Sequence, residues 1–496
     1  MGRGGCGNLF LKIFGEIRDP KLKRKPAFAV VAKSSEEEDE YDLVIARQRV
    51  HHHMKTCGMF ASVMNLIKAA LGAGVMGGHV AYQVAGLAVA IPLNVILAIY
   101  LNYCTYILLW SNQRLCRRAK VASMTYADLG EAAFSCYPSL YLQKVALHFR
   151  YCIDATIMLD LFGSCATYQI IMAKTAKQLF ENTQVSTIEG SGSYPHFRVY
   201  LIALLLPTIG IALITHLKWL APLSAIGNLL ILVCLGVVIW FAFLNNPHFE
   251  NFRMFGNFSG MFQYLGMIIF SMSNCGFVIP MENHMTKPYK FLTAVSISNV
   301  VILVVVMLMS FFGYMAFLDE GETPITANLP MTLIPNILKG LMGGMMYISY
   351  AVNFWPPFEL CWHYLKHKYK SRFLMWESIY RTIIVTLILL VAIIFPTINS
   401  MIGFLGCFCI TNMAMIWPNL IYLLVIWEKP GLGKFKWQLV KGIILIIFGI
   451  IILIAGSIVN MLDLIKHFED INLRSPSGHE DYANEKPTLT KISSFL

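Results

Sequence analysis

A lysine, a histidine and several glycines interrupt the first apolar stretch of the chain. The segment NLIKAALGAGVMGGHV covers residues 65–80 and places Lys68 and His79 among aliphatic side chains. A lysine at the centre of a helix in lipid costs roughly 2.5–3.5 kcal/mol on insertion scales, so we expect Lys68 to face protein or water. Glycines weaken the helix in the same place. The segment therefore predicts an interrupted helix with polar groups that face the inside of the molecule.

A second interruption is predicted where a serine-rich stretch lies within a later apolar segment. Residues 271–276 read SMSNCG and combine polar side chains with a glycine. An interrupted helix frees backbone N–H and C=O groups, which are tolerated at membrane depth only where they line a cavity or contact protein. Helix N-termini favour a carboxylate, whereas freed carbonyls suit an ammonium group or a cation. The two interruptions together predict a site for a zwitterion such as an amino acid.

Other ionisable residues lie within the apolar segments. Asp154 and Asp160 are expected to form structural contacts between helices, while Lys174 and His363 lie near segment ends, where side chains reach the interface. The sequence has no Walker A motif, no metal-ligand spacing and no nucleophile–base pattern. These absences argue against an enzyme, predict neither a metal nor an organic cofactor, and leave an ion gradient as the energy source.

The elements that must position these residues are membrane helices. The chain has 496 residues, of which 57% are hydrophobic and 14% charged, and its mean hydropathy is +0.60. A soluble domain of this size needs far more polar surface. The formal net charge is +11. The basic residues gather in alternate loops, so membrane topology accounts for the charge and nucleic-acid binding is not needed.

We expect an all-α integral membrane protein with eleven transmembrane helices, because several apolar runs reach the ~20 residues that are needed to cross the hydrocarbon core. The interruptions fall in the first and sixth segments, five apart. That spacing is typical of a transporter built from two inverted five-helix repeats, which here leaves one additional helix. The predicted segments are 58–81, 86–110, 145–176, 199–215, 219–244, 260–280, 291–317, 335–364, 376–396, 398–427 and 437–465.

Three regions are predicted along the chain. Residues 1–56 form a polar tail, residues 57–465 the eleven-helix transporter domain, and residues 466–496 a second polar tail. Lysine and arginine are concentrated in the loops on the side of the N-terminal tail, whereas the loop at 318–330 on the other side has none. The positive-inside rule then places the N-terminus in the cytosol and the C-terminal tail outside the cell or in an organelle lumen.

Several longer motifs occur together and in order along the apolar segments. They are NLIKAALGAGVMGG (65–78), VIPMENHMTKP (278–288), FFGYMAFLDEGETPITANLP (311–330), SYAVNFWPPFE (349–359) and RTII (381–384). With these motifs the chain resembles, from Cys57 to Ile465, the proton-coupled amino acid transporters of the amino acid/auxin permease family, within the amino acid–polyamine–organocation superfamily. The resemblance implies eleven spans with the first and sixth broken, and import of small amino acids into the cytosol.

The resemblance also implies a substrate site at the two interruptions. The backbone around Gly72 and the interruption that starts at Ser271 would hold the carboxylate and the amino group of the substrate, and Tyr168 would close one side. The predicted substrate contacts are Gly72, Ala73, Gly74, Tyr168, Ser271, Ser273, Asn274 and Gly276.

The chain departs from the family pattern at residues that concern the coupling ion. Proton-coupled members typically have histidine at the position of Asn65, glutamate at the position of Ser273 and proline at the position of His79. Neither asparagine nor serine carries a proton, whereas an amide oxygen suits a sodium ion, as in related sodium-coupled members. His79 is a candidate replacement, since the ordinary histidine pKa of ~6.5 lies in the useful range. A neutral histidine bonded within the bundle is the alternative. Asn65 and His79 are therefore the predicted ion-coupling residues, for H+ or for Na+.

The leading interpretation is a secondary active transporter that moves amino acids or close analogues into the cytosol together with protons. Sodium coupling and uncoupled facilitated transport are alternatives. A third interpretation is an amino acid sensor that signals through a partner bound to residues 1–50. The expected partners are the amino acid substrate and membrane lipid, and the expected location is the plasma membrane or an endolysosomal membrane.

Overall fold

The chain folds into helices joined by short connections. The computed structural model describes residues 58–119, 121, 123–182, 197–213, 221–245, 252–285, 290–365, 373–427, 431, 433 and 436–473. No strand occurs within these ranges, so the predicted all-α class is confirmed. The tail predicted at 1–56 lies outside the described residues. The last helix continues to Leu473, past the expected boundary at 465.

The helices follow the predicted apolar segments and extend several of them. The first predicted segment consists of α3 (Met59–Ala70) and α4 (Ala73–Ala85), and the sixth of α11 (Phe258–Met272) and α12 (Cys275–His284). The remaining helices are α5 (Leu87–Ala119), α6 (Tyr126–Ser135), α7 (Leu140–Glu181), α8 (Phe197–Ala203), α9 (Leu205–Ala212), α10 (Ala221–Asn245), α13 (Phe291–Phe317), α14 (Leu333–Leu365), α15 (Phe373–Ile394), α16 (Ile398–Leu405), α17 (Trp417–Ile426), α18 (Trp437–Ile451) and α19 (Ser457–Leu473). Short π-helical turns, η7 (Gly406–Ile410), η8 (Asn412–Ile416) and η10 (Ile452–Gly456), join the consecutive helices between α16 and α17 and between α18 and α19.

Most of the predicted spans are long and apolar enough to cross a membrane. Among the described residues, 8 helices pass that test, and the bent pair α3–α4 adds a ninth span. The other two predicted segments are helical as well, one as α8–α9, which is shorter, and one as α14, with 33 residues. The count of eleven therefore stays a prediction, while the all-helical membrane architecture is confirmed.

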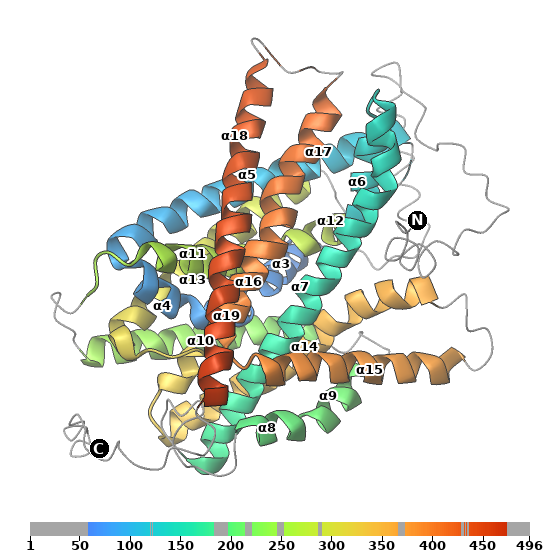
Figure 1. The fold of residues 1–496 in the computed structure, drawn as a ribbon. Helices are drawn as coiled ribbons and strands as arrows, with labels where there is room; N and C mark the ends of the chain where they lie inside the picture. Colours follow the sequence, from blue (N-terminus) through green and yellow to red (C-terminus); the bar gives the residue numbers. More distant parts are fainter. Residues whose placement is uncertain are drawn as a thin grey trace.

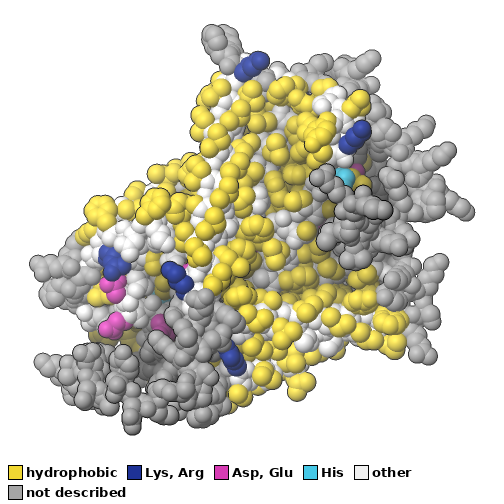
Figure 2. Space-filling view, viewed as in Figure 1, with side chains coloured by type: hydrophobic (Ala, Val, Ile, Leu, Met, Phe, Trp, Pro, Cys, Tyr) yellow, Lys and Arg dark blue, Asp and Glu magenta, His cyan; other side chains and the backbone are white. Residues whose placement is uncertain are grey.

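The outside of the helix bundle is apolar. Figure 2 shows a face covered mainly by hydrophobic side chains, with lysine, arginine and acidic residues toward its margins. Exposed examples are Trp240 on α10, Val300 on α13 and Ile444 on α18. Exposing such an apolar surface to water is unfavourable in free energy, whereas contact with the hydrocarbon core of a bilayer is not. The protein is accordingly a multi-pass membrane protein.

Both predicted interruptions occur, and they lie next to each other. The chain bends by 52° between α3 and α4. Ser273 and Asn274 separate α11 from α12. The two interrupted helices pack together, since α4 lies along α11 and also along α13. The long helix α7 crosses the bundle and packs along α14 (Figure 1).

Glycines let α11 cross α16 and η7 with backbone in contact with backbone. A Cβ atom on Gly266 would lie 2.8 Å from the Cys407 Sγ and would also meet the carbonyl oxygen of Gly403. A Cβ on Gly406 would collide with the carbonyl oxygen of Gly266. A larger residue cannot fit without separating the helices, because neither backbone can move aside.

Gly266→Val is expected to destabilise the protein by ~1–3 kcal/mol, since overpacking a close helix crossing forces the backbones apart. The measurement is the midpoint of thermal unfolding of the purified protein in detergent. Gly236→Val is the matched control, because no atom lies within 4 Å of a Cβ at this exposed position on α10. Equal midpoints for the two variants would contradict the close crossing.

Candidate functional site

The N-terminus of α4 presents backbone N–H groups inside the bundle. The helix begins at Ala73, and the preceding Gly72 offers no side chain to cap it. The N–H of Gly72 donates to the Ala70 carbonyl at 2.9 Å, so the chain turns sharply there. The first N–H groups of a helix have no partner within that helix and carry the positive end of its dipole. This helix end can receive a carboxylate.

Tyr168 on α7 lies against one side of this helix end. A Cβ on Gly72 would lie 2.6 Å from the Tyr168 hydroxyl oxygen, so only glycine permits this approach. The hydroxyl also interacts with the backbone of Ala73 and with the side chain of Asn353 on α14. The Tyr168 side chain is buried. Tyr168 thus connects α4, α7 and α14 at the first interruption.

The second interruption contacts the first through Ser271. A Cβ on Gly74 would lie 2.6 Å from the Ser271 Oγ and 2.8 Å from its Cα. The Ser271 hydroxyl donates to the Met267 carbonyl at 2.7 Å. Gly72, Ala73, Gly74, Tyr168 and Ser271 are therefore together at one place in the structure, and the hydroxyl of Ser271 is already engaged within α11.

Ser273 and Asn274 point to a different place, between α5, α11 and α13. The Asn274 amide donates to the Asn299 side chain at 2.9 Å, and Asn299 donates in turn to Asn102 at 2.9 Å. Ser273 accepts the Cys275 N–H at 3.4 Å. These side chains line a cavity of about 20 Å³, which has room for about one water molecule. Gly276 has open space beside its Cα, since no atom lies within 4 Å of a Cβ there.

A larger cavity lies beside the interruptions, between α4, α7, α11, α16 and α19. Its volume is about 360 Å³, within the range of small-molecule sites. Met267 and Ile170 belong to its wall; Met267 lies one turn of α11 before Ser271, and Ile170 two residues after Tyr168, but none of the predicted substrate contacts lines the cavity. Its polar lining comprises Gln83, Lys174, Gln263, Glu322, Thr323, Thr397, Asn399, Ser400, Asn460 and Asp463.

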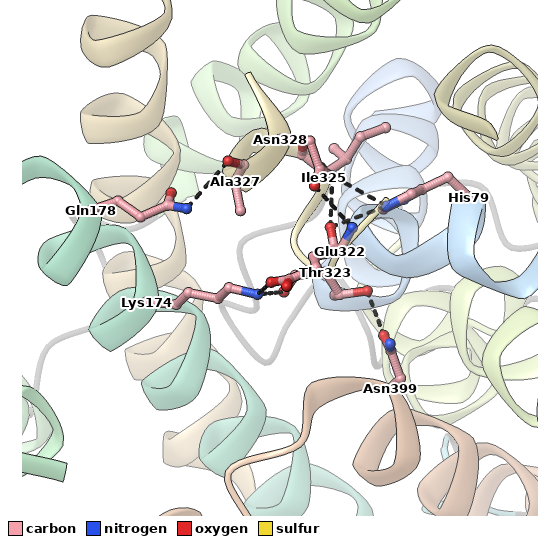
Figure 3. Close-up of polar contacts among 9 residues, drawn as sticks. All are labelled: His79, Lys174, Gln178, Glu322, Thr323, Ile325, Ala327, Asn328 and Asn399. Atoms are coloured by element: carbon pink, nitrogen blue, oxygen red, sulfur yellow. Dashed lines mark hydrogen bonds and ion pairs between the residues drawn. The ribbon is translucent and has the colours of Figure 1, made fainter. Parts of the chain in front are cut away.

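The connection from α13 to α14, residues 318–332, covers this cavity, and we refer to it as the covering segment. Figure 3 shows its contacts with α4, α7 and α16. The Nε2 of His79 on α4 forms a hydrogen bond with the Glu322 carbonyl oxygen at 3.1 Å. The side-chain amide of Asn328 donates to the same oxygen at 2.7 Å. A carbonyl oxygen only accepts, so the Nε2 of His79 carries the hydrogen. Its Nδ1 is buried and has no hydrogen-bond partner in the part of the chain that the structure describes.

Lys174 on α7 forms the ion pair of the covering segment. Its Nζ lies 2.5 Å from the Glu322 Oε2 and donates to the Thr323 carbonyl at 2.8 Å. Only 7% of Lys174 is exposed. The expectation that Lys174 reaches the interface near a helix end was wrong, because α7 continues to Glu181 and leaves Lys174 inside the bundle.

The other ionisable residues have varied surroundings. Asp154 accepts from the Tyr364 hydroxyl at 2.9 Å, which is the expected kind of contact between helices, here α7 and α14. The structural contact that was predicted for Asp160 is not found, since its Oδ1 is buried without a partner among the described residues. Lys68 faces protein as predicted, and its Nζ lies 3.0 Å from the place a Gly227 Cβ would take. The side chain of His363 lies outside the described residues. Asn65 lies on α3, one turn before Lys68, and is half-buried.

Sequence reasoning missed Glu322 and Asp463 as lining residues. Glu322 lies in a connection, where an acidic residue is ordinarily solvated, and Asp463 lies beside the predicted end of the last span. One signal was available for Glu322. A lysine within an apolar segment needs a counter-charge, and the covering segment has acidic residues and no basic one.

Gly72→Ala is expected to destabilise the protein by ~1–3 kcal/mol, because the added methyl group overlaps the Tyr168 hydroxyl. Tyr168→Phe removes that hydroxyl, so the double variant should recover part of the loss. The measurement is a double-mutant cycle of free energies of unfolding, with an expected coupling of ~0.5–3 kcal/mol. Additive effects would contradict the direct contact between the two residues.

Comparisons with known proteins identify a family of membrane transporters. The family described as "Transmembrane amino acid transporter protein" matches residues 55–462. The "Proton-coupled amino acid transporter-like protein pathetic" of Drosophila melanogaster is 30% identical over 415 residues, which cover 82% of this chain and 86% of that protein. The "Amino acid transporter AVT3B" of Arabidopsis thaliana is 23% identical over 411 residues, which cover 80% and 92% of the two chains.

Among solved structures, Mhp1, a nucleobase-cation-symport-1 family transporter in a closed conformation with bromovinylhydantoin bound, is similar with a TM-score of 0.49 and 10% identity. The similarity covers 85% of this chain and 94% of Mhp1. The family match spans most of the chain and includes both interrupted helices. The chain therefore belongs to the family of transmembrane amino acid transporters.

Proposed function

We propose that this protein is a secondary active transporter that carries amino acids into the cytosol. The observation that carries the proposal is the N-terminus of α4, where Gly72 provides no side-chain cap and which lies beside Tyr168 and the second interruption within an apolar bundle. Unsatisfied backbone groups in such surroundings are tolerated where they line a site. The family to which the chain belongs supports an amino acid as the substrate.

The two interruptions match the two ends of an amino acid. The substrate carboxylate binds at the first N–H groups of α4, where the helix dipole favours negative charge. The amino group binds at the last carbonyls of α11, which have no partners within that helix. Tyr168 positions the carboxylate side, and the larger cavity beside the interruptions is the approach from the outer side. The space beside Gly276 is open and is the place for the substrate side chain.

His79 is the proposed proton carrier. Its Nε2–H donates to the covering segment, and its Nδ1 remains available to accept a proton. The charged group that acts on it is Lys174 of α7, whereas Glu322 contacts it through the backbone carbonyl. Protonated His79 carries a positive charge and would repel the ammonium group of Lys174. Protonation of His79 therefore changes the attachment of the covering segment. Sodium coupling through the Asn65 amide oxygen, and uncoupled facilitated transport, remain the alternatives.

The orientation is proposed from charge. The covering segment carries Asp319, Glu320 and Glu322 and no basic residue, which favours the outer or lumenal side, with the N-terminus in the cytosol. Both the plasma membrane and an endolysosomal membrane are compatible with this arrangement. The N-terminal tail, to which the sensor interpretation assigns a signalling partner, lies outside the described residues.

Transport is tested by adding each amino acid to voltage-clamped oocytes at about pH 5.5 and about pH 7.4, on either side of the ordinary histidine pKa, with and without sodium. Acid-stimulated inward current without sodium is the expected result. Sodium-dependent current would favour Asn65 as part of a cation site, and tracer uptake without current would indicate facilitated transport. If the protein is confirmed at the surface and shows no flux and no current, the proposal of transport is contradicted.

His79→Gln is expected to abolish the acid stimulation, because glutamine can still donate to the Glu322 carbonyl but cannot take up a proton. The measurement is the ratio of uptake at about pH 5.5 to uptake at about pH 7.4, which should fall to about one. His148→Gln is the matched control, since His148 is exposed on α7. Full acid stimulation in His79→Gln would exclude His79 as the carrier.

A further inference from the structure

Lys174 is a buried cation at the wall of the larger cavity. A protonated lysine has three N–H donors, and two of them are used by Glu322 and Thr323. Within the described ranges no third acceptor contacts its Nζ. A buried protonated lysine without a counter-charge is strongly disfavoured, so an anion near Lys174 stabilises its charged form. The identity of that anion is less constrained than its presence, because one carboxylate can replace another at the same distance.

The covering segment does not need the Glu322 carboxylate to stay in place. Its backbone is held by side chains of three helices, and none of these bonds involves the carboxylate. Gln83 of α4 donates to the Asp319 carbonyl at 2.6 Å, Gln178 of α7 to the Ala327 carbonyl at 3.2 Å, and Lys339 of α14 to the Leu329 carbonyl at 2.8 Å. The carboxylate of Glu322 can therefore leave Lys174 while the segment remains attached.

The same cavity has an acidic group on another helix. Asp463 of α19 lines it and accepts a hydrogen bond from the Ser400 hydroxyl. The lining thus combines a cation from α7 with a carboxylate from α19, and neutral amides such as Gln263 and Asn399 lie among them. This combination suits a zwitterion, whose carboxylate needs a cation and whose ammonium needs an acceptor.

We propose that the larger cavity is an outer amino acid site, in which Lys174 binds the substrate carboxylate and Glu322 competes with the substrate for Lys174. This inference rests on the proposed function, and it adds a binding station on the outer side of the interruptions. An arriving amino acid exchanges its carboxylate for that of Glu322, and its ammonium faces the acidic lining. Glu322 is thus an internal competitor, which the substrate displaces.

The experiment measures uptake by the purified full chain in proteoliposomes, with L-alanine, L-leucine and L-tryptophan and the primary amide of each as probes. Glu322→Gln removes the competing charge and should lower the half-saturating concentration of the amino acids by about threefold or more, with no change for the amides. Lys174→Gln should raise it by about tenfold or more. Glu320→Gln, an exposed acid on the same segment, is the matched control and should change neither.

One further variant and one further probe keep the result interpretable. The neutral pair Lys174→Met with Glu322→Gln should fold, since replacing a buried ion pair by neutral residues is often tolerated, and it should abolish the gain seen with Glu322→Gln alone. Propionate has the carboxylate of L-alanine without its amino group, so it should compete more weakly than L-alanine. Equal competition by propionate would overturn the assignment of a zwitterion.

Binding is measured separately from transport, as the ligand-dependent rise in the midpoint of thermal unfolding. If no probe is transported but amino acids stabilise Glu322→Gln more than their amides do, the transport proposal fails and the outer site stands. If the wild type transports normally but Glu322→Gln and Lys174→Gln affect amino acids and amides alike, Lys174–Glu322 is only a structural pair and the outer site is overturned.

Discussion

Backbone groups without helical partners, placed in the middle of an apolar bundle, are the constraint on which this structure depends. The interruptions between α3 and α4 and between α11 and α12 create such groups where lipid offers no hydrogen bonds. Protein must therefore surround them. Tyr168 approaches one interruption, Ser271 joins the two, and the asparagines at 102, 274 and 299 form a chain of bonds beside the second.

Small residues make this enclosure possible. Gly72 admits the tyrosine hydroxyl and Gly74 admits the backbone of α11, so the two interrupted helices touch directly. Farther along α11, Gly266 lets α16 and η7 cross at backbone distance. Two cavities with polar side chains in their walls remain between the closely packed helices. The cavity beside Asn299 has room for about one water molecule, whereas the cavity beside Lys174 is large enough for a small molecule.

The sequence predicted what depends on local pattern. Apolar runs identified the helices, and the glycines near Gly72 and the serines near Ser271 identified both interruptions, because weak helix formers in an apolar run are a local signal. The direction of side chains was not predictable in this way. Ser273 lies close to Ser271 in sequence, yet it faces α5 and α13, and only the packed helices decide that. The pairing of Lys174 with Glu322 joins residues 148 positions apart, so no local pattern contains it.

The covering segment is bonded at the same time to α4, α7, α14 and α16, through Gln83, Gln178, Lys339 and Asn399. These bonds hold one short connection at several points, so the segment opens fully only when all of them are broken. Opening on this side therefore requires several hydrogen bonds to break. Such a step has a large activation enthalpy, as local unfolding does. The rate of exchange across this face should consequently rise steeply with temperature, more steeply than diffusion of a small solute through an open pore.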